Sequence, residues 1–298
     1  MTAADVAGRL ERLTGTAVRE LRATGSQFRW NYYHAVLADG RPVFAKVAAA
    51  GLGGVFGAEA RGLRWLGEAG AVGVPGVLGW DDATLVVAQV PAGRADAAAA
   101  DRFGRGLARL HQAGAPGFGA PWPGFIASLS LPNDHPSPAS AAGGTVTWPD
   151  WYRACRVLPY LRLAVDAGTL TGADAVLVES AAARAADVAG PGEPPSRIHG
   201  DCWSGNVLWS GGEGWLIDPA AHGGHRETDL AMLALFGAPF LAEILAAYQS
   251  VAPLAEGWRD RVPLHQLHPL LVHACLYGAA YAPQVREAAQ AALDPSRY

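Results

Sequence analysis

The sequence holds little lysine, few cysteines and no long apolar run. Lys46 is the single lysine among 298 residues, and 23 basic residues against 27 acidic ones give a net charge of -4. An acidic chain offers no electrostatic footprint for nucleic acid, so we expect no nucleic-acid partner. No apolar stretch approaches the ~20 residues of a membrane span, so we expect no membrane partner.

The cysteines Cys155, Cys202 and Cys275 are too few and too scattered for a disulfide framework or a zinc ribbon. They fit a reducing compartment, and residues 1–5 lack the basic segment and apolar run of a signal peptide. We therefore expect a cytoplasmic protein. Half of the residues are hydrophobic, which is enough for a sizeable core, and the length suits two lobes.

Residues 1–91 carry the signals of a small, β-rich N-terminal lobe. Apolar segments on both sides of an Asp-Gly turn at 39–40 predict a hairpin, and residues 58–69 have helical periodicity. An apolar strand at 84–90 stops at a Pro-Ala-Gly tripeptide, which predicts a hinge near 88–93.

Residues 92–298 are predicted to form a larger, mainly helical lobe. Helical patterns occur at about 96–113, 149–167 and 171–188. Residues 114–149 are rich in Gly, Pro and Ser, and so long a loop within a compact domain is more often functional than structural. The chain is therefore predicted to be an α+β protein of two lobes.

The most informative segment begins at His199. It places Asp201 in a His-Gly-Asp sequence, then Asn206, then Asp218 in an Ile-Asp-Pro sequence. Phosphoryl transfer from ATP needs one carboxylate to accept the proton of the attacking hydroxyl, and an amide oxygen and a second carboxylate to hold Mg²⁺ on the phosphates. We predict Asp201 as the base and Asn206 and Asp218 as Mg²⁺ ligands, since Mg²⁺ prefers oxygen donors.

Two short strands are predicted after this loop, at 207–209 and 215–217, with residues 210–214 as the turn between them. A hairpin of that size would bring Asn206 and Asp218 side by side. The predicted ligands are therefore neighbours in space although they are apart in sequence.

Two other interpretations of this segment stay open. In the first, the segment is a polar turn in which Asp201 and Asn206 cap local backbone groups. In the second, it belongs to a hydrolytic metal site that uses His199, His222 and His225.

The sequence motifs around these residues resemble those of the fructosamine kinase (ketosamine 3-kinase) family of aminoglycoside-phosphotransferase-like kinases. The resemblance rests on His-Gly-Asp-x-Trp-Ser-Gly-Asn at 199–206, Ile-Asp-Pro-Ala at 217–220 and Gly-Gly-His-Arg-Glu-Thr-Asp-Leu-Ala-Met at 223–232. Supporting motifs, such as Phe-Ala-Lys at 44–46 and Leu-Ala-Arg-Leu-His at 107–111, extend the resemblance over nearly the whole chain.

The resemblance implies a two-lobed, protein-kinase-like fold with ATP in the cleft. It also implies ATP-dependent phosphorylation of a ketoamine at a sugar hydroxyl, the 3-hydroxyl in this family, after which the unstable product releases the amine. The substrate would be a small fructosamine- or ribulosamine-type ketoamine or a glycated protein. Whether the protein is a monomer or a homodimer stays open.

Lys46 lies on a predicted strand between Ala45 and Val47. A buried lysine is costly unless it is paired, and Glu59 on the next helix is the expected partner. The pair would hold the lysine against the α- and β-phosphates of ATP. The alternative is a surface lysine whose stem is buried.

The nucleotide is expected to meet two backbone segments. Gly25 and Ser26 would belong to the loop that covers the phosphates, although the family usually has a glycine pair there and a plain hairpin turn is an equal alternative. Ala88, Gln89 and Val90 would supply hinge backbone groups to adenine, with Ala88 at a position where the family often has Glu.

Substrate contacts are predicted for three further residues. Trp203 could stack on the sugar or the amine-bearing group, or pack under the loop. Asp134 could pair with the cationic amine, with a turn role as the alternative, and His225 could lie at the substrate mouth. His199 and Asp229 are expected to brace the catalytic loop.

Two other functions compete with ketoamine phosphorylation. One is a kinase of another small hydroxyl substrate, such as an aminoglycoside, choline or a sugar. The other is a noncatalytic ATP-binding module. Such a module is expected to have lost one of Lys46, Asp201, Asn206 and Asp218, and all four are present.

Overall fold

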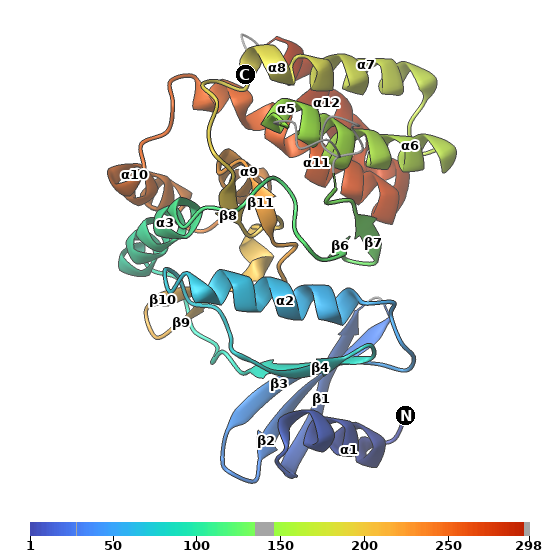
Figure 1. Ribbon diagram of the computed structural model, residues 1–298, viewed down its shortest axis with the longest axis vertical. Coiled ribbons are helices and arrows are strands. Elements are labelled where there is room, and N and C mark those ends of the chain that lie inside the picture. The colour runs from blue at the N-terminus through green and yellow to red at the C-terminus, as the bar shows by residue number, and fades with distance from the viewer. Residues whose placement is uncertain (28, 135–145, 295–298) are drawn as a thin grey trace.

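The computed structural model describes residues 1–27, 29–134 and 146–294. Figure 1 shows a β-sheet with two helices at one end of the molecule and a mainly helical region at the other. The predicted α+β class and two-lobed arrangement are confirmed.

The N-terminal lobe is built on one antiparallel sheet of five strands in the order β1-β2-β3-β5-β4. The strands are β1 Val18–Gln27, β2 Trp30–Leu37, β3 Pro42–Ala48, β4 Val77–Asp81 and β5 Thr84–Ala88.

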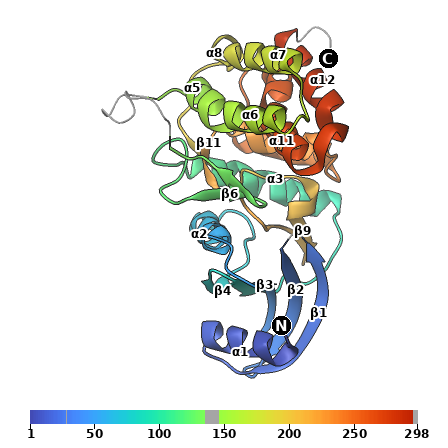
Figure 2. The ribbon, with the colours of Figure 1, turned by 90° about the vertical axis from the view of Figure 1, so that its right-hand side faces the viewer.

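Helices α1 (Ala3–Thr14) and α2 (Val55–Glu68) pack on this sheet. Val43, Ala45 and Val47 of β3 join the core under α1. Because side chains alternate along a strand, Lys46 points to the opposite side, where α2 lies. Figures 1 and 2 place α2 between the sheet and the C-terminal lobe, so Lys46 faces the junction of the lobes.

The C-terminal lobe is mainly helical, as predicted. Its helices are α3 Ala97–Gln112, α5 Trp148–Tyr152, α6 Leu158–Asp166, α7 Gly172–Ala183, α8 Ala185–Val188, α9 Glu227–Leu235, α10 Leu241–Val251, α11 Trp258–Tyr277 and α12 Ala282–Leu293. A π-helical segment, Arg153–Val157, joins α5 to α6, and a short 3₁₀ helix, Gly278–Tyr281, joins α11 to α12. Within the described part of the chain, no helix is both long and apolar enough to span a membrane.

Three small antiparallel strand pairs complete the lobe. They are β6 Gly124–Ile126 with β7 Leu129–Leu131, β8 Ser196–Ile198 with β11 His222–Gly224, and β9 Val207–Ser210 with β10 Glu213–Leu216. The β6–β7 pair lies within the long loop that was predicted over 114–149, of which residues 135–145 lie outside the described ranges.

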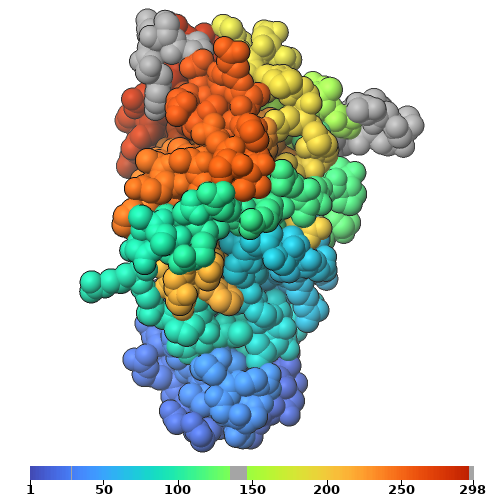
Figure 3. All heavy atoms as spheres, turned by 90° about the vertical axis from the view of Figure 1, so that its left-hand side faces the viewer, coloured from blue at the N-terminus to red at the C-terminus, as the bar shows by residue number. Residues whose placement is uncertain are grey.

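The β9–β10 turn is also shorter than predicted. It consists of Gly211 and Gly212, with φ of 60° and 78°, because a two-residue hairpin turn of this kind needs positive φ at both positions. Figure 3 shows this hairpin in gold at the junction of the lobes, where Arg102 Nε of α3 donates to the Gly212 carbonyl at 2.9 Å.

Candidate active site

Lys46 links the two lobes through carboxylates. Its Nζ donates to Glu59 Oε1 and Oε2 at 2.7 and 2.9 Å and lies 2.9 Å from Asp218 Oδ1. Burial acts to lower the pKa of this lysine, but the carboxylates of Asp218 and Glu59 outweigh it and the pKa is raised. The expected Lys46–Glu59 pair is confirmed, and the ammonium keeps its proton.

His199 and Asp229 brace the loop that carries Asp201. Asp229 accepts the backbone N–H of His199 at 2.7 Å and of Gly200 at 2.9 Å. The Asp201 N–H donates to His199 Nδ1, so the imidazole proton sits on Nε2, which donates to the Ile217 carbonyl at 2.8 Å. His199 therefore ties the loop to the segment that bears Asp218.

Asp201 and Asn206 contact each other directly. Asn206 Nδ2 donates to the backbone carbonyl of Asp201 at 2.9 Å and to its Oδ2 at 3.0 Å. Burial raises the pKa of Asp201 to about 7, and the nearby Asp218 carboxylate acts in the same direction. An ionised carboxylate with a raised pKa is a better proton acceptor than an ordinary aspartate.

Asn206 and Asp218 offer oxygen atoms that suit a hard cation. The Asn206 amide nitrogen is engaged with Asp201, and its Oδ1 accepts no hydrogen bond from the described residues. Asp218 has a φ of 53°, a left-handed conformation that Asp tolerates better than most residues. A carboxylate and an amide oxygen fit the donor preference of Mg²⁺.

Two cavities meet at these residues. One of about 350 Å³ contains Asp201, Asn206 and Trp203 in its wall, and one of about 240 Å³ lies toward the strands. Lys46, Glu59 and Asp218 line both. We call the first the outer cavity and the second the inner cavity.

Ala88, Gln89 and Val90 line the inner cavity, among apolar side chains. The N–H of Ala88 donates to the Gly76 carbonyl at 2.8 Å and that of Gln89 to the Pro42 carbonyl at 3.2 Å. Within the described residues the N–H of Val90 makes no such bond, so it is the backbone donor available to a ligand.

Gly25 and Ser26 do not form the predicted loop. They lie in β1, paired with Tyr32 and Asn31, and neither lines the two cavities. The ladder of hydrogen bonds continues to the end of β1, which moves the turn beyond them. Gln27 is the residue of this segment that reaches the outer cavity.

Trp203 lines the outer cavity and also packs against a neighbouring ring. Its side chain is 38% exposed and lines the outer cavity, while its ring lies edge-on to Phe236 with centroids 5.9 Å apart. The indole also covers Gly205, where an added Cβ would collide with the ring. The glycine therefore leaves room for the ring beside the loop that carries Asp201.

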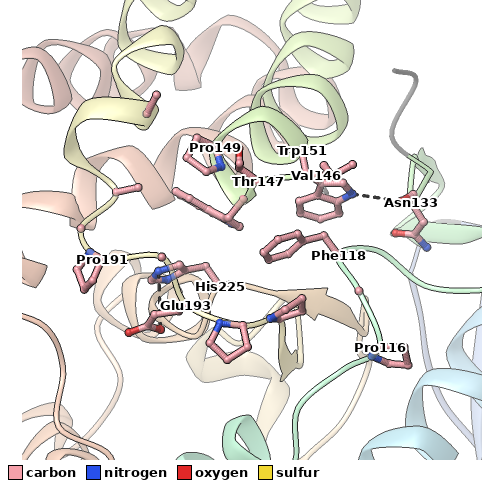
Figure 4. Close-up of a pocket in the computed structure, with 18 of the residues that line it drawn as sticks. Pro116, Phe118, Asn133, Val146, Thr147, Pro149, Trp151, Pro191, Glu193 and His225 are labelled. Carbon is pink, nitrogen blue, oxygen red and sulfur yellow. Dashed lines mark hydrogen bonds and ion pairs between the residues drawn. The ribbon is translucent and has the colours of Figure 1, made fainter. Parts of the chain in front are cut away.

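Asp134 and His225 are placed differently from the prediction. Both line a third cavity, of about 860 Å³, and neither lines the outer cavity with Asp201. Figure 4 shows His225 beside Glu193 in that third cavity. His225 is held there because its ring packs against Trp148, with centroids 4.9 Å apart.

The rival hydrolytic site is not assembled. Among the described residues, the group of potential ligands that converges is His225, Glu227 and His265, without His199 or His222. His225 Nδ1 accepts the backbone N–H of Glu227 at 3.2 Å, so the proton of the neutral ring sits on Nε2 and leaves no lone pair there for a metal.

The sequence interpretation missed one wall of the outer cavity. His273 and Tyr277 of α11 line it. A signal existed in their helical spacing, but α11 mixes polar and apolar residues without an amphipathic pattern, so the spacing did not distinguish the cavity side.

A family profile described as fructosamine kinase matches residues 10–294. The chain belongs to the fructosamine kinase family. It is 32% identical over 260 residues to a probable ketoamine kinase of Klebsiella aerogenes, covering 86% of each chain. It is 33% identical over 233 residues, 76% of each chain, to a probable ketoamine kinase of Escherichia coli K12.

A crystal structure from Thermobifida fusca, provisionally assigned as a fructosamine-3-kinase, is 50% identical with a TM-score of 0.92, covering 98% of this chain and 99% of that one. The gentamicin complex of the aminoglycoside phosphotransferase APH(2'')-IIa is 15% identical with a TM-score of 0.63, covering 99% and 97%, and shows the fold alone. A fructosamine kinase is a phosphotransferase, so the chain is an enzyme of that class.

Of the two residues that hold the Asp201 loop, His199 and Asp229, we expect replacement of Asp229 to lower the stability of the fold more. His111 Nε2 also lies 3.1 Å from its carboxylate, which is fully buried. Burial alone would raise the pKa of Asp229, but the contacts with His111 and His199 lower it. Asp229→Asn puts an amide donor against backbone donors and should destabilise the fold by about 2–5 kcal/mol.

Urea unfolding of Asp229→Asn checks this expectation, with Asp166→Asn as a control for loss of an exposed carboxylate. The control should unfold within about 0.5 kcal/mol of wild type. Equal stability of the two variants would show that Asp229 does not hold the loop.

Proposed function

We propose that this enzyme transfers the terminal phosphate of ATP, in the presence of Mg²⁺, to a sugar hydroxyl of a small ketoamine of the fructosamine or ribulosamine type. The observation that carries the proposal is the convergence of Lys46, Asp201, Asn206 and Asp218 on two adjoining cavities. The family membership and the probable ketoamine kinases among its relatives support the substrate class.

The inner cavity is the proposed adenine site. Apolar side chains of the sheet form its walls, and Val90 N–H is the available donor, with Ala88 and Gln89 beside it. Lys46, oriented by Glu59, binds the α- and β-phosphates. Gln27 replaces Gly25 and Ser26 as the proposed contact from the β1–β2 hairpin.

Asn206 and Asp218 are the proposed ligands of Mg²⁺, which supplies charge neutralisation to the phosphates when it is bound. Asp201 orients the attacking hydroxyl and accepts its proton as the new O–P bond forms, while the bond from the γ-phosphorus to the β–γ bridging oxygen breaks and ADP leaves. Trp203 lies beside this position and contacts the sugar.

Residues 1–91 and 92–298 are the proposed lobes, with the hinge near 88–93.

A substrate panel tests the proposal. Phosphate transfer is measured at matched concentrations for fructosyl- and ribulosyl-amines, free amino sugars, aminoglycosides and choline, with and without Mg²⁺. We expect the highest kcat/KM for a ketoamine. A higher kcat/KM for an aminoglycoside or choline would overturn the substrate class and leave the kinase assignment in place, while nucleotide binding without any transfer would overturn both.

A glycated protein offered beside the free ketoamines separates the two forms of the substrate. Transfer to the free ketoamine alone would restrict the proposal to small molecules.

A further inference from the structure

The third cavity lies apart from the inner and outer cavities, and its described lining contains none of the residues assigned to phosphoryl transfer. It encloses about 860 Å³, which falls within the range of about 300–1,000 Å³ that is usual for small-molecule sites. Figure 4 shows Phe118 and Trp151 on one side of this cavity and His225 beside Glu193 on another. The cavity therefore combines an apolar wall with a pair of polar groups.

The apolar wall is held in place by contacts within the protein. The ring of Trp151 stacks against Phe118 with centroids 5.9 Å apart, and the guanidinium of Arg156 lies 4.2 Å from the same ring. Trp151 Nε1 also donates to the carbonyl oxygen of Asn133 at 3.2 Å. A wall that is already ordered adds little entropic cost to the binding of a ligand.

His225 carries an N–H that none of the described residues accepts. The side chain is 5% exposed, and burial lowers its pKa to about 3, so the ring is neutral at pH 7. Nδ1 accepts the backbone N–H of Glu227 at 3.2 Å, which places the proton on Nε2. The carboxylate oxygen Oε2 of Glu193 lies 3.9 Å from Nε2, too far for a hydrogen bond.

Glu193 supplies an acceptor of fixed position opposite this donor. Arg226 donates from Nε to Oε2 at 2.8 Å and from Nη2 to Oε1 at 2.6 Å. These two bonds orient the carboxylate and balance its charge. Because a carboxylate oxygen accepts more than one hydrogen bond, Oε2 of Glu193 can accept a further bond from a ligand in the cavity.

The distance of 3.9 Å between the donor and the acceptor suits a single oxygen atom that lies about 2.8 Å from each of them. That atom must accept from His225 and donate to Glu193. An ammonium group cannot accept, and a carboxylate or phosphate cannot donate, whereas a neutral hydroxyl does both. Asp134, the other carboxylate in the described lining, is exposed, where charge interactions are weak.

We propose that the third cavity is a second binding site, which takes a neutral sugar. One hydroxyl of the sugar bridges His225 Nε2 and Glu193 Oε2, and the C–H face of its ring lies against the wall formed by Phe118 and Trp151. A sugar presents hydroxyl groups beside an apolar C–H face, as this lining requires. The site is separate from the catalytic cavities, so the inference goes beyond the proposed function and does not depend on it.

Calorimetric titration with three related hexoses tests the choice of ligand. D-glucose is neutral, D-glucosamine carries an ammonium group at about pH 6, and D-glucuronate carries a carboxylate. We expect glucose to bind and the two charged sugars to bind roughly 10-fold more weakly. Glucose should bind equally well when AMP-PNP, Mg²⁺ and 1-deoxy-1-propylamino-fructose are present at saturating concentrations, because these ligands occupy the other two cavities.

Two variants each remove one of the proposed hydrogen bonds. His225→Phe keeps a ring against Trp148 and removes the N–H, and Glu193→Gln keeps the shape of the side chain and removes the carboxylate. Each should weaken glucose binding roughly 10-fold. Glu179→Gln, which removes an exposed carboxylate on α7 outside the cavity, is the matched control and should bind glucose as wild type does. Melting temperatures show which variants are folded, and either variant alone suffices for the comparison.

A crystal structure of the glucose-saturated protein locates the ligand. A sugar hydroxyl between His225 and Glu193 would support the proposal, whereas an ordered water alone at this position would overturn it. The proposal also fails if wild type binds no glucose, prefers a charged sugar or loses glucose when the other cavities are filled. Glucose affinity within about twofold of wild type in the folded variants would overturn it as well. Because none of these measurements uses phosphate transfer, their failure leaves the proposed function in place.

Discussion

Replacing Asp201 with asparagine is expected to lower kcat by roughly 10²–10⁴-fold, which corresponds to about 3–5 kcal/mol of barrier. The substitution keeps the size of the side chain and removes its ability to accept a proton. The hydrogen bond that Asn206 Nδ2 donates to the backbone carbonyl of residue 201 does not depend on the carboxylate. We therefore expect the fold and the affinity for ATP to be retained.

Turnover with a ketoamine, a thermal melt and ATP titration together check this expectation. Asp166→Asn, which removes an exposed carboxylate at the end of α6, is the matched control and should keep full activity. A kcat of Asp201→Asn within about threefold of wild type would rule out Asp201 as the base.

The parts of the site that could be predicted from sequence are local. Asp201 and Asn206 lie on one loop, and the β9–β10 hairpin returns the chain so that Asp218 reaches them. Lys46 and Glu59 follow from strand alternation and from the helix that comes next. In each case a short segment of regular geometry decides which side chains meet.

The position of His225 depends on contacts between distant segments. It was expected at the substrate mouth, but stacking on Trp148 holds it in the third cavity, which Asp134 also lines. No local pattern in the sequence records such packing. Gly25 and Ser26 were misplaced for a local reason, because pairing with β2, the next strand in sequence, extends β1 through them.

His273 illustrates the opposite failure, a cavity residue whose helical spacing did not distinguish the cavity side. A histidine in a largely buried helix is usually a core residue that satisfies its polar atoms internally, and one nitrogen of His273 does so with Pro269. Only the cavity around α11 distinguishes its second nitrogen from that of the fully enclosed His268.

Removing the carboxylate of Asp218 is expected to abolish most of the Mg²⁺ dependence of ATP binding. A ligand mutation should cost at least the 10- to 100-fold in metal affinity that is typical of outer-shell partners. Asp218 has a left-handed backbone, so Asp218→Ala also carries about 1–2 kcal/mol of strain. Asp218→Asn separates the two effects, because Asn tolerates this conformation and keeps an oxygen while losing the charge.

Calorimetric titration of ATP with and without Mg²⁺ measures the effect, and Lys46→Met is the informative comparison. Lys46 contacts both Glu59 and Asp218, so its loss should reduce turnover and nucleotide affinity while the response to Mg²⁺ remains. Asp218→Asn should lie between wild type and Asp218→Ala in metal dependence. An unchanged ATP affinity and an unchanged response to Mg²⁺ in Asp218→Ala would show that Asp218 is not a Mg²⁺ ligand. Identical behaviour of Asp218→Ala and Lys46→Met would show that the separate roles assigned to these two residues are wrong.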